Sequence, residues 1–333
     1  MMLVGDIGGT KTVLALVRPT ASGRDVVREA VYASRDYARF DELLAAFLKD
    51  GGERPETVCL GVAGPVRDGR CQTTNLPWLL DERELGRAVG ARAVKLLNDV
   101  EAAAFGVLAL RDDEVVSLNT GQRAVGNVAV IAAGTGLGEA ILAWDGRRYV
   151  PVPSEGGHAD FSPRTDREIE LLRFLRAEFG RVSCERVLSG PGQHNIYRFL
   201  RDTGAVEEPE WLRDELAAGD PSAVITRVGL AHGHPLCVDA VDLFASLYGA
   251  EAGNLALKSF AVGGVFVAGG IAPKMIDKLR DGTFMTAFTA KGRYRPLMES
   301  IPVSVSLNPR APLLGAARYA TERLLTSHAA QPV

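Results

Sequence analysis

The sequence of 333 residues predicts an α/β protein of two domains, and two observations carry this prediction. Strand-like apolar runs alternate with helical spacings, which is the pattern of helices packed on sheets. A strand–glycine turn–strand unit also occurs twice, at residues 5–16 and again at residues 131–142. Because glycine has no Cβ, the backbone N–H groups of such turns can crowd around a bound anion. We therefore expect two phosphate-binding hairpins that face each other across a cleft.

The first half of the chain predicts a sheet that is partly hairpin and partly parallel. The spacing of apolar residues over Ala38–Leu48 indicates a helix, and a second helix is expected over Val100–Leu110. Glycine-rich residues 121–126 interrupt the pattern, so a second domain is expected to begin near residues 110–125. The expected strands are Leu3–Val4, Val13–Val17, Val26–Val31, Val58–Val62 and Val94–Leu97.

The second half is richer in helices. Thr165 and Glu168 form a capping-box pattern that opens a helix over Ile169–Phe179, and Gly180 closes it. A strand over Val265–Ala268 ends in two glycines. The other expected elements are a helix after Gly190-Pro191-Gly192, helices over Trp211–Leu216, Pro221–Leu230, Val238–Ala261, Pro273–Leu279 and Ala311–Leu325, and a strand over Pro302–Leu307.

Composition excludes several classes of protein. The net charge is −3 with acids and bases mixed along the chain, so there is no basic stripe for nucleic acid or an anionic membrane. The four cysteines are scattered without a C-x-x-C pair, which indicates a reducing compartment and no structural zinc. No apolar run approaches the roughly 20 residues that span a bilayer, and the first strand leaves no room for a signal peptide. We expect a cytoplasmic protein with no nucleic-acid or membrane partner.

Three glycine motifs are candidates for binding a nucleotide. Gly8–Thr12 lacks the P-loop spacing, and Gly134–Gly138 is followed by a strand-like run instead of the helix of a dinucleotide fingerprint. Gly269-Gly270 closes a strand before a helix, a position that suits the nucleoside end of a ligand. The alternative is that all three are tight turns that require positive φ.

Before its glycine turn, only the first hairpin carries an acid, Asp6, where the second has Ala132 and Ala133. A carboxylate there would repel a bare phosphate chain, so we expect Mg²⁺ between them, bound to Asp6 through water. The alternative is a strand aspartate that is hydrogen-bonded to the turn.

Asn98-Asp99 lies at a strand-to-helix junction. One interpretation is an N-cap pair, because Asn and Asp are preferred caps. The other is that Asp99 accepts a proton from a substrate hydroxyl, since a helix N-terminus keeps such a carboxylate ionised.

Further polar residues suit a fan of sugar hydroxyls: Asn75, Glu155, His158 and Glu185. A metal site is the rival interpretation for Glu155 and His158, but neither an i,i+4 nor a C-x-x-C partner supports it. The segment 232–237, with two histidines and a cysteine, lacks a second ligand pair in the same way.

Taken in order, these motifs resemble those of the bacterial glucokinases in the hexokinase/actin-like ATPase superfamily. The motifs are Asp6–Thr12, Leu97–Ala102, Ala133–Gly138, Glu155–His158, Glu185–Gly192, Ala268–Ile271 and Leu313–Ala317, and they cover nearly the whole chain. Lys11 is a departure, because many members have Asn there and Lys is usual in the related repressor-and-kinase (ROK) family. That family carries a cysteine-rich zinc motif after the segment that matches Glu155–His158. Since no such cluster occurs here, the resemblance favours the zinc-free group.

The resemblance implies a two-domain actin-like ATPase/hexokinase (ribonuclease H-like) fold with a deep interdomain cleft. It implies a small α/β domain over residues 1–110, completed by a C-terminal helix at 309–327, and a large α/β domain over 111–308. Related enzymes are often dimers, so the resemblance is compatible with a homodimer, although the sequence itself carries no signal for the oligomeric state.

The implied activity is transfer of the γ-phosphoryl group of ATP to O6 of D-glucose, with Mg²⁺ as cofactor and Asp99 as the base. The residues implied for glucose are Asn75, Asn98, Asp99, Glu155, His158 and Glu185. The residues implied for ATP are Asp6, Gly8, Gly9, Thr10, Lys11, Thr12, Gly134, Thr135, Gly136, Gly138, Gly269 and Gly270, with Mg²⁺ near Asp6.

Three alternatives stay open. One is a kinase for another hexose, an amino sugar or a polyol, because the hydroxyl-binding residues are shared. Another is polyphosphate as the donor, which a cation at Lys11 near the phosphates favours. A sugar-sensing regulator is the third, although no helix-turn-helix for DNA occurs in the sequence.

Overall fold

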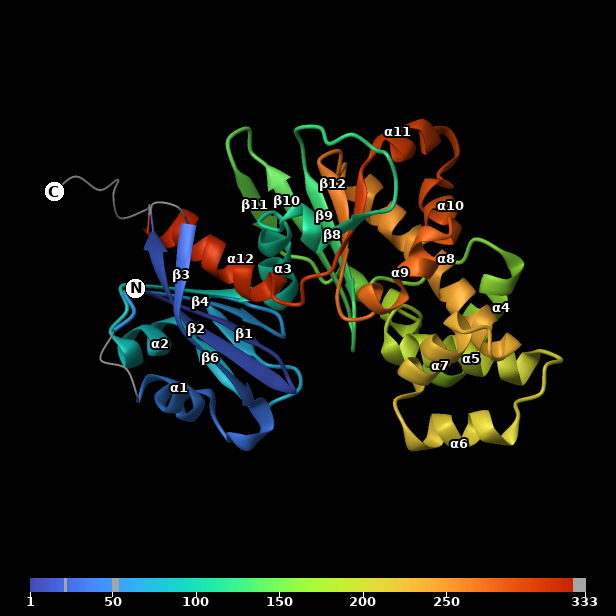
Figure 1. Ribbon diagram of the computed structural model, residues 1–333, viewed down its shortest axis with the longest axis horizontal. Coiled ribbons are helices and arrows are strands. Elements are labelled where there is room, and N and C mark those ends of the chain that lie inside the picture. Colours follow the sequence, from blue (N-terminus) through green and yellow to red (C-terminus); the bar gives the residue numbers. More distant parts are fainter. Residues whose placement is uncertain (21–22, 50–53, 326–333) are drawn as a thin grey trace. The chain divides into compact units, whose positions relative to one another are not determined.

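The computed structural model describes residues 1–20, 23–49 and 54–325, which belong to two compact units (Figure 1). Unit 1 takes Met1–Arg111 and Pro151–Pro153 together with the C-terminal segment from Asn308 on. Unit 2 takes Asp112–Val150 and Ser154–Leu307. The domain limits expected from the sequence stay a prediction at this point, and positions 326–327 of the expected C-terminal helix lie outside the described residues.

Unit 1 is built on a five-stranded sheet with the order β3-β2-β1-β4-β7. The first three strands form an antiparallel meander, and β1, β4 and β7 run parallel. The sheet is therefore half hairpin and half parallel, as the sequence predicts. Its strands are β1 (Met2–Ile7), β2 (Lys11–Thr20), β3 (Gly23–Ala33), β4 (Thr57–Val62) and β7 (Ala93–Asn98).

Helices cover both faces of this sheet. Alternate residues of a strand point to opposite faces, and in β1 Leu3 and Ile7 join one apolar cluster while Met2 and Val4 join another. The first cluster includes side chains of α1 (Phe40–Leu48) and α2 (Glu82–Val89), together with the small hairpin of β5 (Arg70–Gln72) and β6 (Leu79–Asp81). The second includes α3 (Asp99–Val107) and α12 (Ala311–Tyr319).

Two glycines allow α3 and α12 to lie in backbone contact. A Cβ on Gly106 would lie 1.9 Å from the carbonyl oxygen of Ala311, and one on Gly315 would lie 1.7 Å from that of Ala102. No side chain fits at either distance, so glycine is required at both positions. The chain's last helix is thereby held to the helix that begins at Asp99.

Unit 2 is built on a six-stranded sheet with the order β11-β10-β9-β12-β13-β8. The β9–β10 hairpin is antiparallel, β9, β12 and β13 run parallel, and β8 is antiparallel to β13. The strands are β8 (Val115–Ser117), β9 (Val128–Ala133), β10 (Leu137–Trp144), β11 (Tyr149–Val152), β12 (Gly264–Ala268) and β13 (Val303–Ser306).

The main core of unit 2 lies between this sheet and a group of helices. The helix α8 (Pro235–Ser259) has 25 residues and is buried along most of its length, because its side chains are apolar nearly all round. It packs against α5 (Gly190–Thr203), α7 (Pro221–Leu230) and α10 (Thr283–Thr289). The remaining helices of the unit are α4 (Asp166–Phe179), α6 (Glu210–Ala218), α9 (Ile276–Arg280) and α11 (Arg295–Ser300).

The sequence repeat occupies matching places in the two sheets. In each sheet a hairpin is flanked by a further strand on one side and by a parallel strand on the other. Asp6 pairs with Val13 across the hairpin and with Gly61 in the parallel strand. Ala132 likewise pairs with Gly138 and with Ala268. Asp6 of the first copy therefore stands where the second copy has the methyl group of Ala132.

Several expected elements differ in detail from the structure. The helix expected over Pro273–Leu279 is a 3-10 turn followed by α9, and the last expected helix changes to a π-helix after Tyr319. In the expected capping box, Thr165 accepts the N–H of Glu168, but the carboxylate of Glu168 accepts from Arg164 instead. The sequence analysis missed the short elements β5, β6, β8, β11, α2, α10 and α11.

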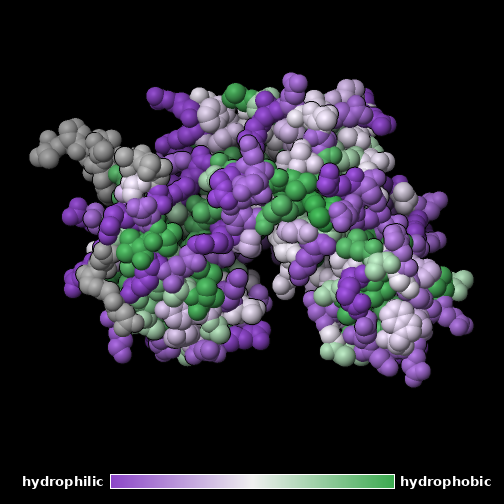
Figure 2. All heavy atoms as spheres, viewed as in Figure 1, coloured by the Kyte–Doolittle hydropathy of each residue, from purple (hydrophilic) through white to green (hydrophobic). Residues whose placement is uncertain are grey.

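Within the part of the chain that the structure describes, no helix has the length and apolar character needed to cross a bilayer. Hydrophilic side chains (purple in Figure 2) are spread over the visible face of both units, and apolar ones (green) form smaller groups among them.

The glycine contacts between α3 and α12 generate a prediction for stability. Gly315→Ala should lower the free energy of unfolding by roughly 3 kcal/mol, because the new methyl group collides with the backbone of α3. Gly86→Ala in α2 is the control: its Cβ would meet Val94 only at 3.3 Å, and Ala favours a helix over Gly by about 1 kcal/mol. Denaturant unfolding of both variants checks this, and equal effects would contradict the steric argument.

Candidate functional site

The glycine turn of unit 1 joins β1 to β2, and hydrogen bonds to the carbonyl groups of its residues hold it in place. The N–H of Gly8 donates to the carbonyl of Lys11 at 3.1 Å. The buried hydroxyl of Ser34 donates to the carbonyl of Gly8 at 2.7 Å, and the N–H of Ser34 donates to that of Thr10 at 3.0 Å. Ser34 also bonds the Thr12 hydroxyl at 2.9 Å. One serine far along the chain thus sets the shape of the turn.

Asn75 lies against this turn. A Cβ on Gly9 would lie 2.7 Å from the Cβ of Asn75, so only glycine allows this approach. The side-chain amide of Asn75 donates to the Thr74 hydroxyl at 3.4 Å. The expected phosphate turn and one expected sugar residue are therefore direct neighbours in unit 1.

Two expected carboxylates lie on either side of Gly61. Asp6 in β1 is paired with Gly61 in β4, and a Cβ on Gly61 would lie 3.7 Å from the Cα of Asp99 at the start of α3. Burial raises the pKa of Asp6 to about 6, and the nearby Lys11 ammonium pulls it the other way. A half-buried carboxylate that keeps a raised pKa has little compensating positive charge around it. That is a suitable place for a cation.

Asn98 is the N-cap of α3, as the first interpretation of the sequence predicts. Its Oδ1 accepts the N–H of Val100 at 2.9 Å, and Glu101 returns the bond by accepting the N–H of Asn98 at 3.1 Å. The Asn98 amide also donates to the carbonyl of Gly64 at 3.2 Å. This cap places Asp99 in the first turn, where the helix dipole favours its ionised form.

The glycine turn of unit 2 is closed by backbone bonds and by one carboxylate. Gly134 donates to the carbonyl of Gly136 and accepts from Gly190, both at 2.8 Å. Oε2 of Glu185 accepts the N–H of Leu137 at 3.0 Å. A Cβ on Gly136 would lie 2.5 Å from that oxygen. The expected sugar residue Glu185 is therefore bonded to the expected phosphate turn.

Gly269-Gly270 lies beside the same turn. A Cβ on Gly269 would lie 2.3 Å from the carbonyl oxygen of Ala133, and the N–H of Ile271 donates to that oxygen at 3.2 Å. The buried Tyr248 hydroxyl accepts the N–H of Ala133 at 3.1 Å. Together these contacts fix the end of β9 where the turn begins.

The segment that carries Glu155 and His158 packs on the other side of Leu137. It contains the short 3-10 helix Gly156–His158, and a Cβ on Gly157 would lie 1.9 Å from the carbonyl oxygen of Leu137. The side chains of Glu155 and His158 are exposed. Arg181 donates to the backbone carbonyl of His158 and forms an ion pair with Asp160 at 2.7 Å.

The structure thus collects the expected residues into two groups. Unit 1 brings together Asp6, the Gly8–Thr12 turn, Asn75, Asn98 and Asp99. Unit 2 brings together the Gly134–Gly138 turn, Glu155, His158, Glu185 and Gly269-Gly270.

Sequence reasoning missed the residues that support these groups, namely Ser34, Leu137, Arg181 and Tyr248. Each acts through a contact with a residue distant in sequence, or through a main-chain atom. The sequence pattern carries no signal for such contacts.

Among the described residues, no group of three or more His, Cys, Asp or Glu side chains is arranged to hold a metal ion. In segment 232–237, His234 caps α8 through Nδ1 at 3.4 Å from the N–H of Leu236, and Cys237 is fully buried. Any metal at Asp6 would therefore need further ligands from water or from a bound molecule.

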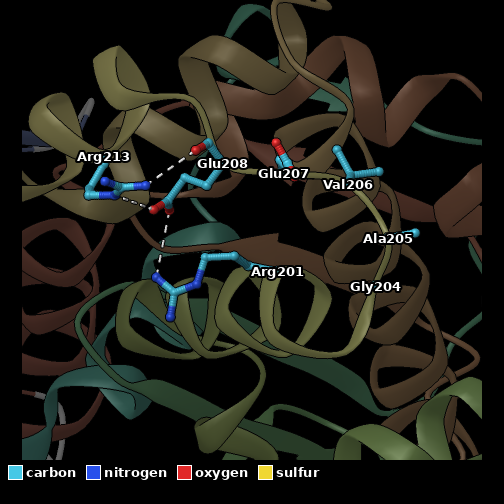
Figure 3. A pocket seen from close by; sticks show the side chains of 7 residues that line it. All are labelled: Arg201, Gly204, Ala205, Val206, Glu207, Glu208 and Arg213. Atoms are coloured by element: carbon cyan, nitrogen blue, oxygen red, sulfur yellow. Dashed lines mark hydrogen bonds and ion pairs between the residues drawn. The ribbon is translucent and has the colours of Figure 1, made fainter.

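A separate cavity of about 750 Å³ opens in unit 2 between α5 and α6 (Figure 3). Its charged groups neutralise one another, because Glu208 pairs with Arg213 at 3.2 Å and with Arg201 at 3.6 Å. Glu208 also accepts the Tyr197 hydroxyl at 2.8 Å. None of the expected site residues lines this cavity.

Comparisons with known proteins show what the chain is similar to. The sequence profile of the Glucokinase family matches residues 3–323. The glucokinase of Trichormus variabilis is 40% identical, with 95% of this chain and 98% of that protein covered. A crystal structure of glucokinase from an Antarctic psychrotroph has a TM-score of 0.83 at 30% identity, covering 95% of this chain and 97% of that one.

A more distant likeness concerns the fold alone. A ROK family glucokinase from Streptomyces griseus, solved in complex with glucose and AMPPNP, has a TM-score of 0.65 at 23% identity, covering 96% of this chain and 99% of that one. These likenesses confirm the predicted fold class, the two-domain α/β architecture of the hexokinase/actin-like ATPase superfamily.

The Glu185–Leu137 hydrogen bond gives a structural prediction. Gly136→Ala should break it, because its methyl group would occupy the position of the carboxylate, and hydrogen exchange at the Leu137 amide should accelerate. The expected loss of stability is about 1–3 kcal/mol. Gly134→Ala is the matched control, since its Cβ would meet nothing within 4 Å. Amide exchange followed by NMR distinguishes the two variants. Unchanged exchange in Gly136→Ala would show that the bond does not depend on this glycine.

Proposed function

This chain belongs to the glucokinase family, and on that premise we propose that it transfers the γ-phosphoryl group of ATP to O6 of D-glucose. The single observation that carries the proposal within the structure is the arrangement around Leu137. There a glycine turn of the kind that binds phosphate contacts both Glu185 and the segment of Glu155 and His158. A sugar kinase needs donor and acceptor groups held at a set separation, because its catalysis is mainly positioning.

In unit 1 we assign the proton transfer to Asp99. Its place in the first turn of α3 keeps it anionic, as a base for the O6 hydroxyl must be. Asn98 has a second amide hydrogen beyond the one given to Gly64, and this can donate to a sugar hydroxyl. Asn75 is the further hydroxyl partner in this group.

In unit 2 we assign the remaining sugar contacts to Glu155, His158 and Glu185. One oxygen of Glu185 is engaged by Leu137, which leaves the other to accept a hydroxyl. One imidazole and two carboxylates supply polar partners for a ring of sugar hydroxyls.

The two glycine turns suit the phosphates of ATP. Thr10, Thr135 and the amides of Gly9 and Gly136 would hydrogen-bond the phosphoryl oxygens, where charge spreads in a loose transition state. The open space at the Cβ position of Gly134 lets the backbone approach an anion closely, and Gly269-Gly270 is assigned to the adenosine side.

Mg²⁺ fits the donor chemistry of unit 1. Asp6 offers a half-buried carboxylate with a raised pKa, and we assign it to hold Mg²⁺ through water. When bound, the ion would neutralise part of the phosphate charge. Lys11 is exposed on the same turn and would add a second positive charge.

We further propose that units 1 and 2 are the two domains expected from the sequence, and that the enzyme acts in the cytoplasm. The homodimer stays a prediction, which sedimentation analysis would test.

The substrate is tested directly by a coupled assay over glucose, mannose, fructose and N-acetylglucosamine, each with ATP and with polyphosphate. The proposal expects glucose with ATP to have the highest kcat/KM. A higher value for another sugar would transfer the assignment to that sugar, and a preference for polyphosphate would overturn the donor assignment. Polyphosphate is included in the assay as a second donor because the Lys11 ammonium lies on the turn that we assign to the phosphates.

Asp99→Asn should keep glucose binding but lower kcat by roughly 10²–10⁴-fold, because the amide cannot accept the proton. Glucose affinity by calorimetry and kcat by the coupled assay separate the two effects. Asp112→Asn, an exposed change outside the proposed site, should leave both unchanged. A near-normal kcat in Asp99→Asn would exclude Asp99 as the base.

The raised pKa of Asp6 predicts a pH effect on the donor side. Asp6 must be ionised to hold Mg²⁺, so the KM for Mg·ATP should rise about tenfold per pH unit below about pH 6. Asp6→Asn should raise that KM at every pH and remove its pH dependence, with a smaller effect on the KM for glucose. Asp36→Asn is an exposed control near the same turn. Equal losses for both substrates in Asp6→Asn would contradict the metal role.

A further inference from the structure

Glu139 is a buried acid that has no part in the proposed reaction. It lies in β10, two residues after Leu137, and its side chain is only 3% exposed. Burying an ionised carboxylate is costly unless other groups pair with it. Its Oε1 has no hydrogen-bond partner among the described residues. Such a costly burial indicates that this acid has a role in the protein.

The carboxyl group lies directly beneath the segment that carries Glu155 and His158. A Cβ on Gly156 would lie 2.1 Å from Oε2 of Glu139 and 2.9 Å from its carboxyl carbon. Glycine at 156 is therefore what allows the segment to rest on this side chain. The N–H of Gly156 donates to the Ser154 hydroxyl at 3.0 Å.

We propose that Glu139, as a neutral carboxylic acid, positions the Glu155–His158 segment for the sugar, and that its ionisation loosens sugar binding. This inference rests on the proposed function, because Glu155 and His158 are its sugar-binding residues. Glu139 itself touches no expected ligand and is a positioning residue.

The groups around Glu139 favour its neutral form. Glu251 of α8 is 6% exposed and faces it with a negative charge, while Lys258 of α8, which lies 3.5 Å from Glu251, pulls the other way. Burial first, and then Glu251, raises the pKa of Glu139 to about 7. Cys184 is a further buried neighbour, and burial keeps its thiol protonated by raising its pKa.

The other packed elements add little charge. Strand β9 has no titratable side chain, and β11 has only Tyr149. The segment itself contributes Glu155 and His158, whose side chains are exposed. Glu251 is itself held by the Asn254 amide at 2.9 Å, so it cannot turn away from Glu139 without losing that bond.

Ionisation of Glu139 would place a second negative charge beside Glu251. Oε1 of Glu139 would then carry negative charge without a hydrogen-bond donor among the described residues. The nearest element that can move is the Glu155–His158 segment, which rests on the carboxyl group. Sugar affinity should therefore fall as pH rises through about 7, while the chemical step, assigned to Asp99 in unit 1, should not change with it.

The decisive variant is Glu139→Gln, which keeps the size of the side chain and cannot ionise. In the wild type, the KM for glucose should rise roughly fivefold between about pH 6 and about pH 8, and in Glu139→Gln it should stay near its low-pH value. The matched control is Glu168→Gln, which removes a buried acid paired with Arg164 at 2.6 Å. It should lose stability but keep the wild-type profile. Any contribution from His158 is shared by all three proteins.

A second variant keeps the test decisive if Glu139→Gln folds poorly. Glu251→Gln removes the facing charge, so the pKa of Glu139 should fall and the rise in KM should begin at lower pH. A KM profile that is the same in the wild type, Glu139→Gln and Glu251→Gln would overturn the proposal.

The pH dependence of stability tests this inference independently of the proposed function. The folded state holds the Glu139 proton more tightly than the unfolded state, so wild-type stability should fall as pH rises from about 4.5 to about 7. Glu139→Gln should lack this part of the slope. If the slope differs but the wild type does not phosphorylate glucose, the proposed function fails alone. If the slopes are equal, the inference fails whatever the activity.

Discussion

The main chain of Leu137 is the point on which the arrangement of unit 2 depends. Its N–H is held by Glu185, and its carbonyl lies against Gly157. Both contacts require the absence of a side chain at a neighbouring position, because Gly136 and Gly157 leave no room for a Cβ. The main chain of one residue therefore sets the distance between the glycine turn and the three side chains that we assign to sugar hydroxyls. Catalysis by positioning needs such a fixed spacing.

Unit 1 uses the same scaffold for a different purpose. Its hairpin and parallel strand match those of unit 2, but Asp6 stands where unit 2 has Ala132. The neighbouring strand provides Gly61, whose missing side chain leaves room for the start of α3 and hence for Asp99. The cap formed by Asn98 and Glu101 sets the helix start, so a local rule of helix chemistry decides where the proposed base lies.

Sequence patterns predicted well those features that depend on neighbouring residues. Strand alternation located β1, β2, β4 and β9, and glycine placement identified both turns. The strand after Gly138 correctly excluded a dinucleotide fold. Short strands such as β5 and β8 were missed because their three residues carry too little periodicity. Residues 273–279 begin as a 3-10 turn instead of the expected helix.

The sequence by itself determined the fold class, the family and the residue types available for phosphate and sugar. These follow from order and spacing, which a linear pattern records. Only the tertiary structure decided that Ser34 shapes one turn, that Glu185 bonds the other, and that Glu139 lies buried beneath Gly156. These contacts join residues that are mostly far apart in the chain. Their geometry comes from packing of whole elements, which no local spacing encodes.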